Sequence, residues 1–142
     1  MLKTIKTNLF KYLLVLLVII AVFTSGCNSE KSQIFFNVHP FSEETIVSNT
    51  NVFKPNQRIY YLITLPNPVK TQRLLVQIFK VGSNQRLGYE IVWGKQVKVR
   101  DEQFHYYTDY VVISQPGTYI MKVYSKDEPT KLLTNSEFYV KN

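Results

Sequence analysis

The stretch that decides the fold is residues 115–125, which read Gln115-Pro116-Gly117-Thr118-Tyr119-Ile120-Met121-Lys122-Val123-Tyr124-Ser125. Pro116 and Gly117 are turn-forming residues, and a period-two pattern begins directly after them. One set of positions (Tyr119, Met121, Val123) alternates with another (Ile120, Lys122, Tyr124). Because successive side chains of a strand point to opposite faces, the pattern predicts a strand at Thr118–Ser125 with one buried face, as in antiparallel sheets.

Short runs of β-branched and aromatic residues, separated by turn formers, fill the chain on both sides of this stretch. They predict strands at Gln33–Val38, Arg58–Leu65, Arg73–Val81, Leu87–Val99, Gln103–Ile113, Thr118–Ser125 and Lys131–Lys141. Within one of them, a single face should hold Tyr89, Ile91 and Trp93, and continue to Val97 and Val99 if no bulge intervenes. Ser42–Asn51 fits a long loop, a helical turn or a strand.

No segment after Cys27 keeps an apolar helical period, so the expected fold class is all-β. About seven strands in roughly a hundred residues predict a single antiparallel β-sandwich over residues 34–142. A small open barrel or a jelly roll would give a similar pattern.

The turn before Tyr119 resembles a feature of immunoglobulin-like sandwiches. Gln115-Pro116-Gly117-Thr118-Tyr119 is similar to the turn and tyrosine that open the penultimate strand of those domains. The resemblance implies that the Tyr119 hydroxyl turns back to the preceding corner. It covers roughly Arg58–Asn142 and concerns the architecture rather than antibody domains, because Met121 stands where those domains carry a cysteine, and Trp93 lies outside the expected third strand.

The N-terminus has the three-part layout of a secretory signal. Met1–Lys11 carries three lysines, Tyr12–Phe23 is an uninterrupted apolar run of twelve residues, and small residues follow. As a helix the apolar run would span about 18 Å, short of the roughly 30 Å hydrocarbon core of a bilayer. Residues 1–26 are therefore predicted to be a signal peptide. An uncleaved anchor helix is the alternative.

Thr24-Ser25-Gly26-Cys27 resembles the lipobox of bacterial lipoproteins, with Thr24 where leucine is usual. The resemblance implies cleavage between Gly26 and Cys27, and acyl chains such as palmitate on the Cys27 residue. Residues 27–33 would then be a lipidated cysteine with a short polar tether. The protein would sit in the cell envelope, lipid-anchored on the extracytoplasmic side of a membrane, with inner or outer membrane left open. An ordinary signal peptide with an accidental cysteine is a further alternative.

Charge and cysteine content exclude several classes of protein. Of 17 basic residues three lie in the predicted signal, which holds no acid, so 14 basic and 10 acidic residues remain, a net +4. A modest excess of positive charge, with no run of lysine and arginine residues, argues against nucleic-acid binding. Cys27 is the only cysteine, which rules out a disulfide within the chain and a cysteine-rich zinc site.

The sequence offers no set of catalytic residues, so we expect neither an enzyme nor a cofactor or metal ion. His105 and Asp109 share a face of one strand, but four positions separate them by about 13 Å, too far for one metal ion. A site formed across strands by His105 with Asp101 or Glu102 is the alternative considered.

The chain is rich in tyrosine, with 10 residues of this type. Tyrosine is common at protein and sugar contact surfaces, although it is also an ordinary strand former. The candidate binding surface consists of Tyr106, Tyr107, Tyr110, Tyr124 and Tyr139. The resulting hypothesis is a non-catalytic, membrane-tethered binding or assembly module that recognises an envelope protein or glycan. A structural accessory subunit and a small envelope enzyme are the alternatives.

Overall fold

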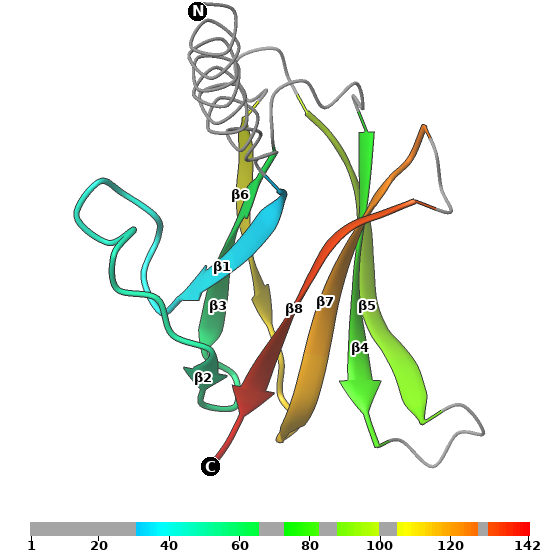
Figure 1. Ribbon diagram of the computed structural model, residues 1–142. Helices are drawn as coiled ribbons and strands as arrows, with labels where there is room; N and C mark the ends of the chain where they lie inside the picture. The colour runs from blue at the N-terminus through cyan, green and yellow to red at the C-terminus, as the bar shows by residue number, and fades with distance from the viewer. Residues whose placement is uncertain (1–30, 66–72, 83–87, 100–104, 128–130) are drawn as a thin grey trace, which may run out of the picture.

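The computed structural model describes residues 31–65, 73–82, 88–99, 105–127 and 131–142, and within them all regular secondary structure is β. The strands are β1 (Gln33–Asn37), β2 (Val52–Phe53), β3 (Arg58–Thr64), β4 (Arg73–Val81), β5 (Tyr89–Lys98), β6 (Tyr106–Val112), β7 (Gly117–Ser125) and β8 (Leu132–Val140). They form a three-stranded sheet, β1-β3-β6, and a five-stranded sheet, β2-β8-β7-β4-β5. The two sheets lie face to face (Figure 1). The all-β, two-sheet expectation is confirmed.

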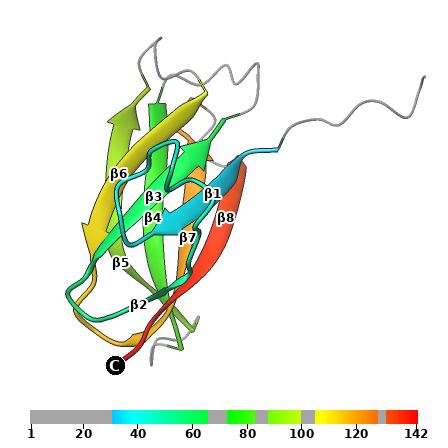
Figure 2. The same ribbon diagram turned by 90° about the vertical axis from the view of Figure 1, so that its left-hand side faces the viewer.

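Each of the seven expected strands is present, with ends that differ by a few residues where they can be compared. Neighbouring strands run antiparallel, except that β2 pairs in parallel with β8. β2 was not expected, because two residues are too few for a periodic pattern. Consecutive strands often belong to different sheets (Figure 2). Backbone pairing therefore joins segments far apart in the sequence, such as β4 with β7.

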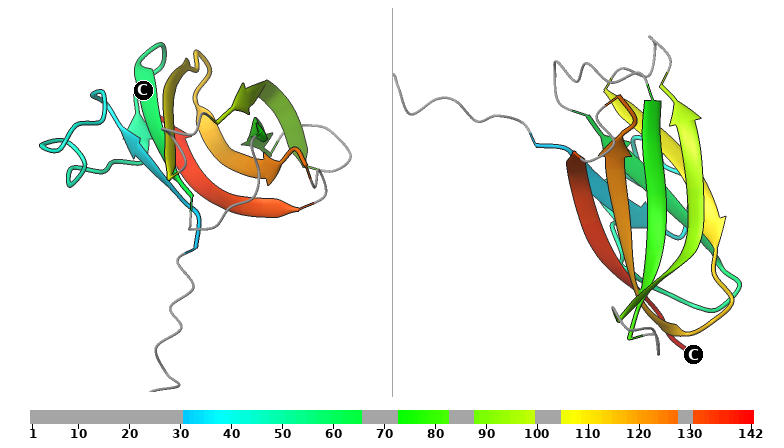
Figure 3. Two further views of the ribbon diagram at one scale, coloured as in Figure 1. Left: turned by 90° about the horizontal axis from the view of Figure 1, so that it is seen from above. Right: turned by 90° about the vertical axis from the view of Figure 1, so that its right-hand side faces the viewer.

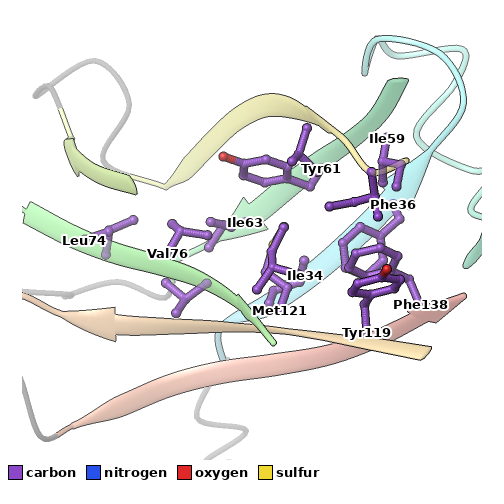
Figure 4. Close-up of a cluster of buried hydrophobic side chains, with 14 of the residues drawn as sticks. Ile34, Phe36, Ile59, Tyr61, Ile63, Leu74, Val76, Tyr119, Met121 and Phe138 are labelled. Atoms are coloured by element: carbon purple, nitrogen blue, oxygen red, sulfur yellow. The ribbon is translucent and has the colours of Figure 1, made fainter. Parts of the chain in front are cut away.

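The core lies between the sheets and takes alternate residues of β3, β4 and β7. In β7, Tyr119, Met121 and Val123 are buried, as the alternation predicted, and so are the corresponding positions of β3 and β4. Figure 4 shows these side chains filling the space between the two layers. At one end of the core the rings of Phe36, Phe53 and Phe138 lie 5.0–6.4 Å apart between centroids, so three strands, β1, β2 and β8, meet there.

The corner before β7 is closed by a side-chain hydrogen bond. The Tyr119 hydroxyl donates to the carbonyl oxygen of Gln115 at 2.7 Å, which is the contact that the resemblance in this turn implied. The ring of Tyr119 is stacked on that of Phe138, with centroids 5.4 Å apart. One side chain thus fixes the turn and contributes to the core.

A bulge in β5 contradicts the face predicted for this strand. Ile78 of β4 lies opposite Trp93, but the next residue, Phe79, lies opposite Ile91, so Val92 is an extra residue. An extra residue exchanges the faces of a strand. Trp93 therefore packs against the core, whereas Tyr89 and Ile91 lie on the outer side and are about half exposed. The expectation that these three side chains share one face was wrong.

Ser42–Asn51 forms hydrogen-bonded turns. The backbone N–H of Ile46 donates to the carbonyl of Ser42, and the Thr45 hydroxyl donates to the carbonyl of Pro40. The buried Asn37 amide donates to the Thr45 carbonyl and ties the segment to the end of β1. Serine and threonine side chains satisfy backbone groups locally, which favours turns over a strand or helix.

The predicted signal peptide, the apolar run Tyr12–Phe23 and Cys27 lie outside the described residues. In the part of the chain that is described, no helix has the length and apolar character needed to cross a membrane.

Candidate functional site

The outer side of the three-stranded sheet carries a surface rich in tyrosine. In β3 the residues Ile59, Tyr61 and Ile63 are fully buried, so Tyr60 between them points outward. Tyr60 lies opposite Tyr110 of β6, and their ring centroids are 5.7 Å apart. We call this surface the tyrosine face; it consists of Arg58, Tyr60, Tyr106, Thr108 and Tyr110.

The tyrosine face combines exposed rings with one cation. Tyr106 and Tyr110, both in the edge strand β6, keep 48% and 45% of their surface exposed. The guanidinium of Arg58 lies over the Tyr110 ring, 5.0 Å from its centroid. Stacking on a ring holds a long side chain in place, so arginine and tyrosine present one ordered surface.

The five tyrosines expected to form one binding surface do not lie together. Tyr106 and Tyr110 belong to the tyrosine face. Tyr107 lies between them on the opposite side of the strand and packs against the core. Tyr124 and Tyr139 lie on the outer side of the five-stranded sheet. The prediction of one surface with all five tyrosines was therefore wrong, because the outer sides of the two sheets face in opposite directions. The candidate surface is smaller and lies on β3 and β6.

A cluster of polar groups connects β5 and β6, the edge strands of the two sheets. Asp109 accepts hydrogen bonds from Lys95 Nζ at 2.6 Å, from the Tyr107 hydroxyl at 3.1 Å and from the backbone N–H of Tyr110 at 2.9 Å. Burial alone would raise the pKa of Asp109. The hydrogen bonds outweigh it and hold the pKa below its ordinary value, so the carboxylate stays ionised.

Next to this cluster Tyr61 is buried with its hydroxyl unpaired. Its ring lies 6.4 Å from Trp93 and 6.3 Å from Tyr107 between centroids. Among the described residues the hydroxyl oxygen has no hydrogen-bond partner. Burial raises the pKa of Tyr61, and the nearby Tyr107 and Asp109 add to the effect, so this phenol remains protonated.

Comparison with known proteins identifies no family. No family model matches the chain, and no curated protein matches it. Among solved structures, the chain is similar to part of a β-glucosidase from Listeria innocua, with 11% identity, a TM-score of 0.44, and coverage of 79% of this chain and 16% of that one. It is also similar to part of the alkylpurine DNA glycosylase AlkC from Pseudomonas fluorescens, with 16% identity, a TM-score of 0.40, and coverage of 79% and 31%. The chain thus spans less than a third of either enzyme.

His105, the histidine considered for a metal site, takes part in no metal cluster of the described residues. His105 is exposed just before β6, and its carbonyl oxygen accepts a hydrogen bond from the backbone N–H of Leu65. The acids considered with it, Asp101 and Glu102, lie outside the described residues. His39 is exposed after β1, where its backbone N–H donates to the Asn37 side chain.

Two features of these surfaces were missed at the sequence level. Arg58 and Tyr60 share a face of the expected strand Arg58–Leu65, so the alternation rule could have added both to the candidate surface. The pairing of Lys95 with Asp109 had no sequence signal, because it joins two sheets whose register the local pattern does not fix.

Proposed function

We propose that this protein is a membrane-anchored bacterial lipoprotein that acts as a non-catalytic binding module of the cell envelope. In this proposal residues 1–26 are a signal peptide, and Cys27 carries acyl chains that hold the domain on the extracytoplasmic side of a membrane. The proposal is based on the order of the N-terminal segments: a basic segment, then an apolar run, then small residues that end at Cys27. Two or more acyl chains make such anchoring firm.

The domain in this proposal is an immunoglobulin-like sandwich. Two observations support the assignment. The strand order, β1-β3-β6 against β2-β8-β7-β4-β5, exchanges consecutive strands between sheets as Greek-key sandwiches do. The Tyr119 hydroxyl donates to the Gln115 carbonyl at the corner before the penultimate strand.

The tyrosine face is the observation that carries the binding role, and the partner proposed for it is an envelope protein. Tyrosine and arginine are enriched among residues that dominate protein interfaces. Tyr106, Tyr110 and Arg58 supply exposed area in an ordered arrangement that loses little entropy on binding. Because the anchor confines the domain to a membrane surface, a modest intrinsic affinity is sufficient there.

Site-directed photo-crosslinking of the full-length chain in intact cells tests the binding role. A photoreactive residue replaces Thr108, an exposed residue between the rings of Tyr106 and Tyr110. The control replaces Val47, which is 84% exposed and lies in the turns after β1. We expect one protein to be captured at Thr108, not at Val47, and to be lost when Tyr110→Ala and Arg58→Ala are combined. Equal capture at the two positions, or capture of polysaccharide alone, would overturn the assignment.

Intact-mass measurement of the membrane fraction tests the anchor separately. We expect a chain that begins at Cys27 and carries acyl chains, and we expect the Cys27→Ala variant to lack them. An unmodified full-length mass would overturn the lipoprotein assignment and leave the binding role of the tyrosine face open.

A further inference from the structure

The outer side of the five-stranded sheet, opposite the tyrosine face, is both basic and aromatic. Its cations are Arg73, Lys98, Lys122 and Lys141, and its rings are Phe79, Tyr89, Tyr124 and Tyr139. Among the residues that strand pairing places on this side, Glu137 is the one acid. We call this surface the basic face; it is the broad side turned to the viewer in the right panel of Figure 3.

The strand register shows that these cations share one side. Arg73 lies opposite Lys98, and both are next to the buried pair Leu74 and Val97, so they point outward. Lys122 lies opposite Gln77 on the same side. Four cations thus lie on one side of the five-stranded sheet, whereas Arg58 is the one cation among the five residues of the tyrosine face.

Apolar side chains and lysines are interleaved on this face. The ammonium of Lys122 lies 4.9 Å from the ring centroid of Phe79 and 5.7 Å from that of Tyr89, and Lys141 lies 5.1 Å from that of Tyr139. Ile91 is 56% exposed beside them, on the outer side because of the bulge in β5. Apolar and tyrosine side chains that alternate with lysines on one surface are the combination found where proteins contact the headgroups of a bilayer.

The path of the chain brings a bilayer within reach of this face. In the proposed lipoprotein, four residues lead from the acylated Cys27 to Lys31, a span of about 14 Å at most. The strand that follows, β1, packs against β8, a strand of the five-stranded sheet that carries the basic face (Figure 2). In this proposal the anchor thus keeps the domain within contact distance of the headgroups.

We propose that the basic face lies on an anionic phospholipid bilayer, the membrane that holds the Cys27 acyl chains. The proposal rests on the anchoring proposed above. Charge complementarity selects this side, because Arg73, Lys98, Lys122 and Lys141 attract anionic headgroups, whereas Arg58 is the one cation among the five residues of the tyrosine face. In this orientation the tyrosine face points away from the bilayer and stays available to a partner.

The single cysteine of the chain permits a direct test. Acylation blocks the sulfur of Cys27, so a cysteine introduced elsewhere is the one free thiol. Ile91→Cys probes the basic face, and Thr108→Cys is the matched control on the tyrosine face. The acylated full chain is added to preformed vesicles of phosphatidylglycerol and phosphatidylethanolamine, and its labelling by a membrane-impermeant maleimide is compared with labelling in detergent.

We expect the vesicles to protect Ile91→Cys and not Thr108→Cys. If the domain is docked for about 80–90% of the time, the labelling rate of Ile91→Cys falls roughly five- to tenfold. The protection should diminish in phosphatidylcholine vesicles and at high salt. Combining Lys98→Glu with Lys141→Glu should abolish it, whereas Arg58→Glu on the other face should leave it unchanged.

The outcomes separate this inference from the proposals on which it rests. An acylated chain with equal labelling rates at both positions would overturn the orientation but leave the anchor intact. Protection in native membranes but not in lipid vesicles would indicate a protein on the basic face and overturn the orientation too. A chain that carries no acyl group by mass would overturn the anchoring, and the orientation with it.

Discussion

Lys95 Nζ lies 2.6 Å from Oδ2 of Asp109, and this ion pair joins the edge strands of the two sheets. The other partners of the carboxylate, the Tyr107 hydroxyl and the Tyr110 backbone N–H, come from β6 itself. Lys95 is therefore the partner that reaches this carboxylate from the other sheet. The pair bridges the two sheets near the buried Tyr61, whose pKa the charge of Asp109 helps to raise.

Replacing Asp109 with asparagine should lower stability in a pH-dependent way. The pKa of Asp109 lies below its ordinary value in the fold: burial would raise it, but hydrogen bonds from Lys95, the Tyr110 N–H and Tyr107 outweigh burial. A lowered carboxyl pKa stabilises the fold above the unfolded pKa of about 3.8, and this contribution is lost as the pH falls through the folded pKa. Because Lys95 is 47% exposed, screening limits the effect to about 1 kcal/mol at pH 7. Urea unfolding at pH 7 and at pH 2.5 measures it.

The Lys95→Met variant and the double variant provide the control for that experiment. The coupling energy from the double-mutant cycle should be larger at pH 7 than at pH 2.5, because protonation of Asp109 removes the charge pair as the pH falls. A difference between wild type and Asp109→Asn that is equally large at both values of pH would show that charge is not the cause.

Tyr119→Phe should destabilise the fold by about 1–2 kcal/mol in urea unfolding. The change removes the hydrogen bond to the Gln115 carbonyl and leaves the ring stacked on Phe138. Tyr124→Phe, in the same strand but on the outer side, serves as the control and should change the free energy of unfolding by less than about 0.5 kcal/mol. Equal effects of the two variants would contradict a structural role for the corner.

Unlike Tyr119→Phe, the variant Tyr61→Phe should not lower the free energy of unfolding. The Tyr61 hydroxyl is buried without a partner among the described residues, so its removal relieves a desolvation cost and loses no hydrogen bond there. We expect the free energy of unfolding to stay constant or to rise by up to about 1 kcal/mol. A clear loss of stability in this variant would mean that the hydroxyl is satisfied in solution, for example by an internal water molecule.

Strand positions and the buried face of β7 followed from local pattern, because alternation and turn residues act over a few positions. Tyr119, Met121 and Val123 show this. The contact of the Tyr119 hydroxyl with the corner at Gln115 was expected from the resemblance to immunoglobulin-like domains, not from the alternation. The bulge at Val92 did not follow from the sequence, since an extra residue is visible only against the partner strand. For the same reason the outward side of Tyr89 and Ile91 was missed.

The candidate surface was predictable in part. Tyr106 and Tyr110 were identified because residues two or four positions apart in a strand share a face. Their separation from Tyr124 and Tyr139 depends on which sheet each strand joins, and that is decided by long-range pairing. The parallel strand β2 was beyond the same local rules, because its two residues are held by β8 and the core.

The last prediction concerns β2, which is short but carries a core residue. Phe53 is 2% exposed, and its ring centroid lies 6.4 Å from that of Phe36 and 6.2 Å from that of Phe138. Phe53→Ala should therefore cost about 3–4 kcal/mol in urea unfolding, the range for a large aromatic residue removed from a core. Val52→Ala is the matched control, because Val52 is 45% exposed on the opposite side of the same strand, and it should cost less than about 0.5 kcal/mol.

Hydrogen exchange gives a local measurement of the same effect. The backbone N–H groups of Tyr139 and Lys141 donate to the carbonyl oxygens of Asn51 and Phe53, and they should be the first to lose protection in Phe53→Ala. If the two variants were equally stable, the ring of Phe53 would not be what holds β2 against β8.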